Sequence, residues 1–129
     1  MTDVQHHRLI ILGSGPAGYT AAVYAARANL QPHLVSGIEP GGQMTITTDV
    51  ENYPGYEDVI QGPWLMEQMR IQAKKVGTII YNDIIIDINL KSKPFTAISD
   101  LGIQFESKSI IISTGAQARW LNIESEKKF

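Results

Sequence analysis

Three glycines, Gly13, Gly15 and Gly18, form the most informative pattern in this sequence of 129 residues. In a G-x-G-x-x-G arrangement the first glycine permits a tight turn and the second lets a pyrophosphate approach the backbone. The third allows a helix to pack closely on a strand. The helix after the motif would direct its free N–H groups at the phosphates, and Pro16 suits its first turn because proline has no N–H to leave unpaired. The motif predicts the binding of a dinucleotide.

The sequence around the motif strengthens this prediction, because a single glycine motif also occurs in loops that bind nothing. Residues 9–12 are four consecutive aliphatic residues, which predict a strand buried on both faces of a parallel sheet. Residues 19–28 are rich in alanine, as in a helix whose backbone lies close to the sheet. Pro32 ends that helix, and residues 33–36 predict a second strand. Together these segments form a βαβ unit.

The end of the second predicted strand offers a ribose contact. In βαβ units of this kind an acidic residue near that point commonly binds the ribose hydroxyls. The strand ends in Ser36 and Gly37, and Glu39 is the nearest carboxylate. Glu39 is therefore the candidate, with a solvated loop acid as the alternative.

The stretch 37–62 is rich in glycine and proline and is longer than most connections in compact domains, so we expect it to line a site. Gly41 and Gly42 would allow close backbone approach. Gln43 and Asn52 carry amides that suit the polar edge of a planar heterocycle. The alternative is that all four are only turn residues.

The rest of the sequence predicts a helix and several strands. The helix spans residues 64–76, where Leu65, Met69, Ala73 and Val76 recur at the spacing of one helical face. Strands are predicted at residues 78–81, 84–90, 94–98 and 103–106, as a small antiparallel meander, and at residues 109–113. The last strand runs into a second glycine turn, Thr114-Gly115-Ala116, and open α/β sheets bind ligands at such strand ends. The predicted fold class is α/β.

Composition excludes several function classes. The 11 basic and 13 acidic residues give a formal net charge of −2 without a basic stripe, which argues against a nucleic-acid partner. No apolar run approaches the roughly 20 residues of a membrane span, and no secretory signal is present, so a cytoplasmic protein without a membrane partner is expected.

The residues that most often carry catalysis are absent or isolated. There is no cysteine, and hence no disulfide, thiolate or cysteine-ligated metal from this chain. His6 and His7 are expected in a solvated lead-in to the first strand, far in sequence from His33, so no metal site is predicted. Asp49 and Glu51 are interpreted as solvated loop acids. We expect no catalytic residue in this chain.

Four motifs in order carry a family resemblance: the stretch from Gly13 to Ala28, then Gly41-Gly42-Gln43, then Glu51 to Gly55, and Ser113 to Ala116. From about Arg8 to the last residue the sequence closely resembles bacterial low-molecular-weight thioredoxin reductases. The resemblance implies a Rossmann-like FAD-binding domain, in which parallel strands and helices are joined by a small antiparallel meander. It implies that the nucleotide is FAD rather than NAD.

The resemblance also implies roles for individual residues. The first glycine turn would hold the dinucleotide, and the loop after the second strand would follow the ribose, pyrophosphate and flavin. Asn52 would approach the isoalloxazine, and Ile85 would lie near the adenine. The last glycine turn would close over the cofactor. The expected cofactor-binding residues are Gly13, Ser14, Gly15, Pro16, Ala17, Gly18, Ser36, Gly37, Ile38, Glu39, Pro40, Gly41, Gly42, Gln43, Asn52, Ile85, Thr114, Gly115 and Ala116.

The sequence departs from the family after the flavin segment. Family members continue into an NADPH domain with a redox Cys-x-x-Cys, pass electrons from NADPH through FAD and the dithiol to thioredoxin, and are homodimers. This chain ends at Phe129 without a cysteine. It is therefore interpreted as an incomplete FAD domain, residues 1–121, followed by a linker stub, residues 122–129. Alone, it is expected to lack disulfide reductase activity and to retain FAD weakly or not at all.

Two alternatives stay open at this point. The chain could act as a non-enzymatic flavin-binding or interaction module. It could also belong to a related flavoprotein of the ferredoxin–NADP reductase type, which shares the fold.

Overall fold

The computed structural model describes residues 4–127, so the extreme ends of the two predicted segments, residues 1–3 and 128–129, lie outside the described part. The elements in chain order are β1 (Val4–Leu12), α1 (Pro16–Arg27), β2 (His33–Val35), the 3-10 turn η1 (Gly42–Ile46), β3 (Asp49–Val50), β4 (Ile60–Gln61), α2 (Gly62–Lys75), β5 (Ile79–Tyr81), β6 (Ile85–Asn89), β7 (Phe95–Ser99), β8 (Gln104–Ile112) and the 3-10 turn η2 (Glu124–Lys127).

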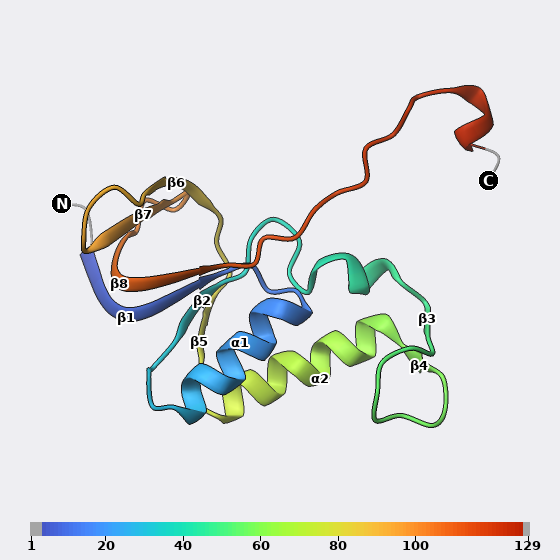
Figure 1. Ribbon diagram of the computed structural model, residues 1–129, viewed down its shortest axis with the longest axis horizontal. Coiled ribbons are helices and arrows are strands. Elements are labelled where there is room, and N and C mark those ends of the chain that lie inside the picture. Colours follow the sequence, from blue (N-terminus) through green and yellow to red (C-terminus); the bar gives the residue numbers. More distant parts are fainter. Residues whose placement is uncertain (1–3, 128–129) are drawn as a thin grey trace.

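A six-stranded sheet in the order β5-β2-β1-β8-β7-β6 organises the molecule (Figure 1). The four strands β5, β2, β1 and β8 are parallel, whereas β6, β7 and β8 form an antiparallel meander. The parallel order follows from the βαβ unit, because α1 returns the chain so that β2 pairs alongside β1. The predicted fold class, α/β with a mostly parallel sheet and a small meander, is confirmed. The prediction that the strand at residues 78–81 belongs to the meander is wrong, because that strand is β5, which pairs parallel with β2.

One face of the sheet is covered by the two helices. Leu9 and Ile11 of β1 pack with the buried faces of α1 and α2 in one apolar cluster. Ala22 of α1 is fully buried there, so its small side chain permits the close approach of helix and strand that the alanine-rich sequence predicts. The predicted face of α2 is confirmed at Leu65, Met69 and Ala73, while Val76 is the C-cap and only partly buried.

The other face of the sheet is covered by its own meander, which curls over it in Figure 1. Ile10 of β1 and Val35 of β2 pack with Ala97 of β7 and Phe105 of β8, and Ile85 and Ile88 of β6 join this cluster. The central parallel strands β1, over residues 9–12, and β2 are thus buried on both sides, as the aliphatic run of β1 predicts. In the flanking parallel strands Ile79 of β5 and Ile112 of β8 are exposed.

The two strands predicted at residues 103–106 and 109–113 are a single strand, β8. The prediction was wrong because the polar pair Ser107 and Lys108 resembles a break between strands. Ser107 is instead buried within the strand, and its hydroxyl donates a 2.7 Å hydrogen bond to the Ser109 carbonyl. A polar residue whose hydroxyl is satisfied locally interrupts the apolar pattern without ending the strand.

The prediction of a solvated lead-in at His6 and His7 is wrong in part: His6 is exposed as predicted, but His7 is partly buried. Both residues belong to β1, which pairs with β8 from Val4 onward. The His7 ring lies 3.8 Å from the His33 ring, centroid to centroid, and contacts Phe105. We call the side chains of Gln5, His7, His33, Tyr81 and Phe105 the histidine cluster. It packs the amino-terminal half of the sheet.

The histidine cluster is held by polar contacts and disfavours charge. The Tyr81 hydroxyl donates to the Gln5 side-chain oxygen at 2.7 Å and lies 3.3 Å from His33 Nδ1. Burial, reinforced by the neighbouring His33 and His6, lowers the pKa of His7 to about 4. Burial also lowers the pKa of His33. Within residues 4–127, no group of three or more potential metal ligands lies together.

The predicted irregular stretch 37–62 contains the short turn η1 and the two-residue strands β3 and β4, which pair with each other. After β8 the chain leaves the sheet and extends away from the body of the molecule (Figure 1). In that tail the carboxylate of Glu126 accepts N–H bonds from Leu121 and Asn122, while Trp120 and Leu121 are exposed. No helix in the described part of the chain has the length and apolarity that crossing a membrane requires.

Candidate dinucleotide-binding site

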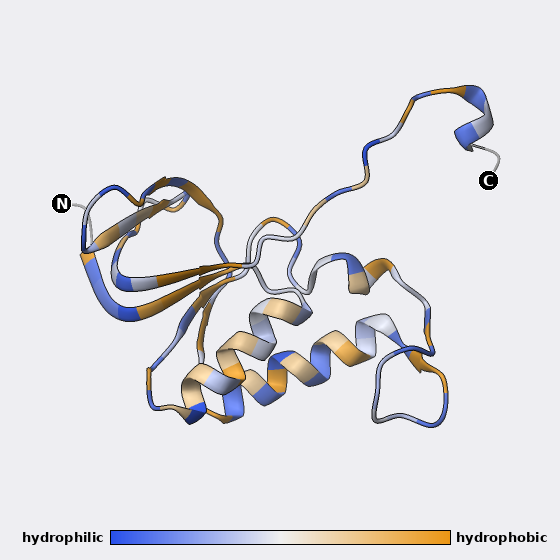
Figure 2. Ribbon diagram, viewed as in Figure 1, coloured by the Kyte–Doolittle hydropathy of each residue, from blue (hydrophilic) through white to orange (hydrophobic). Residues whose placement is uncertain are grey.

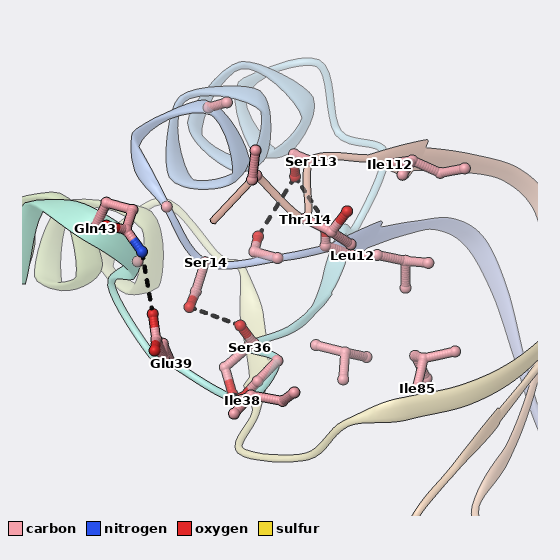
Figure 3. Close-up of a pocket in the computed structure, with 18 of the residues that line it drawn as sticks. Leu12, Ser14, Ser36, Ile38, Glu39, Gln43, Ile85, Ile112, Ser113 and Thr114 are labelled. Carbon is pink, nitrogen blue, oxygen red and sulfur yellow. Dashed lines mark hydrogen bonds between the residues drawn. The ribbon is translucent and has the colours of Figure 1, made fainter. Parts of the chain in front are cut away.

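The carboxyl ends of β1, β2 and β8 meet at a cavity of about 850 Å³ (Figure 3). This volume is within the range of roughly 300–1,000 Å³ that is typical of small-molecule and cofactor sites. The position is the one expected for ligands of open parallel sheets, outside the carboxyl ends of the strands. Most of the sequence-predicted site residues line the cavity: Gly13, Ser14, Gly15, Pro16, Ala17, Ser36, Gly37, Ile38, Glu39, Gly42, Gln43, Ile85, Thr114, Gly115 and Ala116.

Gly13 and Gly18 are required by the fold itself. Gly13 has a φ of +104°, and a Cβ there would overlap the Ser113 carbonyl oxygen. A Cβ at Gly18 would overlap the carbonyl oxygen of Gly13. These two glycines therefore allow the turn and the contact of α1 with the end of β1, as the motif predicts.

Gly15 has no such structural reason to be glycine. Its φ of −69° is accessible to any residue, and a Cβ built on it would meet no atom within 4 Å. Because Gly15 lines the cavity, the missing side chain leaves its backbone open to a ligand. This absence fits the close approach of a pyrophosphate.

The amino terminus of α1 supplies unpaired backbone donors at the same place. Gly15 is the N-cap and Pro16 occupies the first turn, and no side chain caps the helix. The first N–H groups of a helix have no acceptor within it, and the helix dipole is positive at this end. Pro16 and Ala17 line the cavity, so this end of α1 borders it.

Two serine hydroxyls bind the first glycine turn to its neighbours, as the dashed lines in Figure 3 mark. Ser14 donates to the Ser36 carbonyl at 2.9 Å, which joins the turn to the end of β2. Ser113 donates to the Leu12 carbonyl at 2.8 Å, which joins the ends of β8 and β1. The cavity floor is thus connected across three strands.

The wall after β2 carries the polar side chains of the site. Gln43 Nε2 donates to Glu39 Oε2 at 3.5 Å, a long contact between two exposed side chains. Within residues 4–127, Glu39 is the only ionisable side chain that lines the cavity, and no lysine or arginine does. An anionic ligand would therefore be neutralised by backbone N–H groups and the helix dipole rather than by cations.

Four predicted residues do not line the cavity. Gly18 lies behind the first turn, and Gly41 is buried, with its N–H donated to Ser14 Oγ at 3.0 Å. Pro40 is not among the lining residues, and Asn52 is exposed in the connection between β3 and β4. The contacts predicted for these residues stay predictions.

The sequence reasoning missed most of the apolar lining. The additional residues are Leu12, Val35, Met44, Ile84, Ile88, Ile112, Ser113 and Gln117. A usable signal was present, because the last residue of each parallel strand must face the same edge as the turn after it. Leu12, Val35 and Ile112 are the last residues of β1, β2 and β8, whereas Tyr81, at the end of the fourth parallel strand β5, does not line the cavity.

Comparison with known proteins fits this geometry. The sequence pattern described as pyridine nucleotide-disulphide oxidoreductase matches residues 7–129. The chain belongs to this family. Membership is consistent with the fold and with the cavity at the strand ends, because such oxidoreductases act through nucleotide cofactors that parallel α/β sheets hold at this edge.

Several proteins similar to this chain are thioredoxin reductases. That of Rickettsia bellii is 57% identical over 122 residues, which are 95% of this chain and 39% of the relative. That of Vibrio cholerae is 52% identical over 129 residues, 100% of this chain and 40% of the relative. The solved thioredoxin reductase from Giardia duodenalis aligns with a TM-score of 0.86 and 41% identity, over 96% of this chain and 40% of that one.

The solved thioredoxin reductase of Lactococcus lactis gives a TM-score of 0.84 at 39% identity, over 95% of this chain and 40% of that one. The present chain therefore spans about 40% of the length of the relatives that it matches.

Proposed function

We propose that this chain is the part of a thioredoxin reductase that binds the ADP half of FAD and positions the flavin. The observation that carries the proposal is that three features occur together at Gly15. A glycine that the fold does not need lies beside the uncapped amino terminus of α1, in a cavity with no cationic side chain among the described residues. A diphosphate held by backbone donors fits that combination.

Residues of the chain would take distinct parts in binding. Gly13 to Ala17 would hold the pyrophosphate, with Gly15 giving the closest approach. Glu39 would accept hydrogen bonds from the ribose hydroxyls, and Ile85 would lie against the adenine. Thr114 to Ala116 would close the cavity from the end of β8. Asn52 would reach the isoalloxazine only if the β3–β4 connection extends toward it, since it lies outside the cavity wall.

FAD, when bound, supplies two-electron transfer between a nicotinamide and a dithiol. The chain's residues would bind and orient it, and the cavity walls would exclude water from the apolar part of the site. Neither a dithiol nor a thiolate can come from these 129 residues, because they contain no cysteine. The NADPH site, the dithiol and the contact with thioredoxin would belong to other parts of the enzyme.

The remaining features of the proposal follow from similarity to thioredoxin reductases. Residues 1–121 would form the amino-terminal part of the FAD domain, and residues 122–129 would lead toward the redox domain. The whole enzyme would act in the cytoplasm as a homodimer, with thioredoxin as the protein substrate.

The experiment is a titration of the chain with FAD, followed by flavin fluorescence, with NADPH as the competing nucleotide. The proposal predicts saturable FAD binding that ADP competes for and NADPH does not. The Gly15→Ala variant should bind FAD at least about tenfold more weakly, because its methyl group occupies the position of the pyrophosphate. Equal binding by Gly15→Ala and wild type, or preferential binding of NADPH, would contradict the proposal.

A further inference from the structure

Ser14 is more buried than Ser36, the other buried polar residue that lines the cavity. The side chain is 1% exposed. Its hydroxyl donates to the Ser36 carbonyl at 2.9 Å and accepts the Gly41 N–H at 3.0 Å. Those partners lie 22 and 27 residues away along the chain. One side chain therefore joins the first glycine turn to the end of β2 and to the loop after it.

These bonds occupy the hydroxyl from both sides. A serine hydroxyl has one O–H donor and two lone pairs. The donor is used by the Ser36 carbonyl and one lone pair by the Gly41 N–H, and the Tyr19 hydroxyl is a further side-chain partner of Ser14. No O–H is left to donate to a phosphate oxygen. Although Ser14 lines the cavity, its donor serves the chain rather than a ligand.

The loop that Ser14 holds is conformationally demanding. Gly41 is buried and has a φ of +92°, and Gly42, the next residue, also has a positive φ of +66°. If the Ser14 oxygen were removed, the Gly41 N–H would be left buried without its acceptor. An unsatisfied buried donor disfavours the conformation that creates it. The loop would then move away from the first turn, and the cavity between them would widen.

We propose that Ser14 is a positioning residue that sets the separation between the two loops flanking the dinucleotide cavity and thereby determines ligand affinity without itself donating to the ligand. This inference rests on the proposed function for its effect on FAD. Its structural part, the attachment of the 37–42 loop to the first turn, does not depend on any ligand.

The test compares Ser14→Ala with Ser107→Ala. Ser107 is a matched control, because it is also 1% exposed and its hydroxyl also donates to a backbone carbonyl, but in the strand β8 away from the cavity. Two quantities are measured for each variant and for wild type: the affinity for FAD and the hydrogen-exchange rate of the Gly41 amide by NMR. Urea unfolding gives the global stability of each protein.

The proposal predicts that Ser14→Ala binds FAD about tenfold more weakly, the effect of losing one to two buried hydrogen bonds. It also predicts that Gly41 exchanges at least about tenfold faster in Ser14→Ala. Ser107→Ala should match wild type in both. Unchanged FAD affinity in Ser14→Ala, or equal losses in the two variants that follow their stability, would overturn the proposal.

Two further outcomes are separable. If wild type binds no FAD, the proposed function fails, and the Gly41 exchange in the two variants still decides whether Ser14 holds the loop. If Ser14→Ala does not fold, the wild-type Gly41 amide decides instead. Its exchange must be slowed as strongly as that of Gly42, whose N–H donates to the Glu39 carbonyl at 2.8 Å, and an unprotected Gly41 amide would refute the attachment.

Discussion

The two ends of the same three strands, β1, β2 and β8, are built in opposite ways. At their carboxyl ends the chain turns through residues with little or no side chain, and a cavity of about 850 Å³ lies between the turns. At the other end β1 and β2 contribute His7 and His33, which pack against each other and toward Phe105 of β8. The carboxyl end of the sheet is kept open by a large cavity. The other end is largely filled by these rings, with only a smaller cavity of about 230 Å³ that His6, His7 and His33 help to line.

The cavity at the open end exists because the turns there consist largely of glycine and other small residues. The packing at the filled end comes from contacts between large side chains. Figure 2 follows this along β1, which is hydrophilic near its start and hydrophobic where it approaches the cavity. Substitutions at the open end should therefore fall into two groups. Some should lower the stability of the fold, and others should lower only the affinity for a ligand. Substitutions in the histidine cluster should affect stability alone.

The largest effect is expected at Gly13. Gly13→Ala should lower the free energy of unfolding by about 3 kcal/mol, because it combines a positive φ with overlap of the Ser113 carbonyl. Gly15→Ala should change it by less than about 1 kcal/mol, because neither condition applies there. Urea unfolding followed by circular dichroism measures both. Equal losses in the two variants would remove the distinction between structural and ligand-related glycines.

An intermediate effect is expected from acid at the histidine cluster. The pKa of His7 is lowered from 6.5 to about 4 in the folded chain, so the unfolded chain binds more protons between these pH values. Stability should therefore be complete above pH 6.5 and fall as the pH falls toward 4. His33, whose pKa is also lowered, should add to this loss.

The variant His7→Leu should reduce that pH dependence. His6→Gln should reduce it much less, because His6 is the smallest of the three causes that lower the pKa of His7. Urea unfolding at a series of pH values tests this. If His7→Leu leaves the dependence of the free energy of unfolding on pH unchanged, the loss of stability in acid arises from other groups.

The smallest effect is expected at the rim of the filled end. His6 Nδ1 lies 3.0 Å from the Glu106 carboxylate in an ion pair that is largely open to solvent on the histidine side. Glu106→Gln should change the free energy of unfolding by no more than about 0.5 kcal/mol. A loss of stability as large as that of Gly13→Ala would show that the His6–Glu106 contact, and not the histidine cluster, stabilises this end of the sheet.

The sequence was sufficient to predict the fold class and the open end, because their signals are local. Aliphatic runs mark the parallel strands, and glycines mark positions where a side chain cannot be accommodated. For the same reason Gly13, Gly15 and Ser36, which the sequence groups together, line one cavity, and their contacts with a cofactor stay predictions. The residues need only lie at strand ends, and strand ends in a parallel sheet meet at one edge.

The filled end could not be predicted because its signal is not local. His7 and His33 are polar residues in the first half of strands, where solvation is the ordinary expectation. Only the pairing of β1 with β2 and β8 brings them together and partly buries them. The two hydrogen bonds of Ser14 were hidden for a related reason. Their partners are distant in sequence and are backbone groups, which no side-chain pattern marks.

The most direct test of the central claim is an NMR map of the FAD complex of this chain. If the open end is the dinucleotide site, the backbone amide shifts caused by FAD should concentrate in residues 13–17, 36–43 and 114–117, and the histidine cluster should be unaffected. Shifts centred on His7 and His33, or shifts spread evenly over the sheet, would contradict the assignment of the open end.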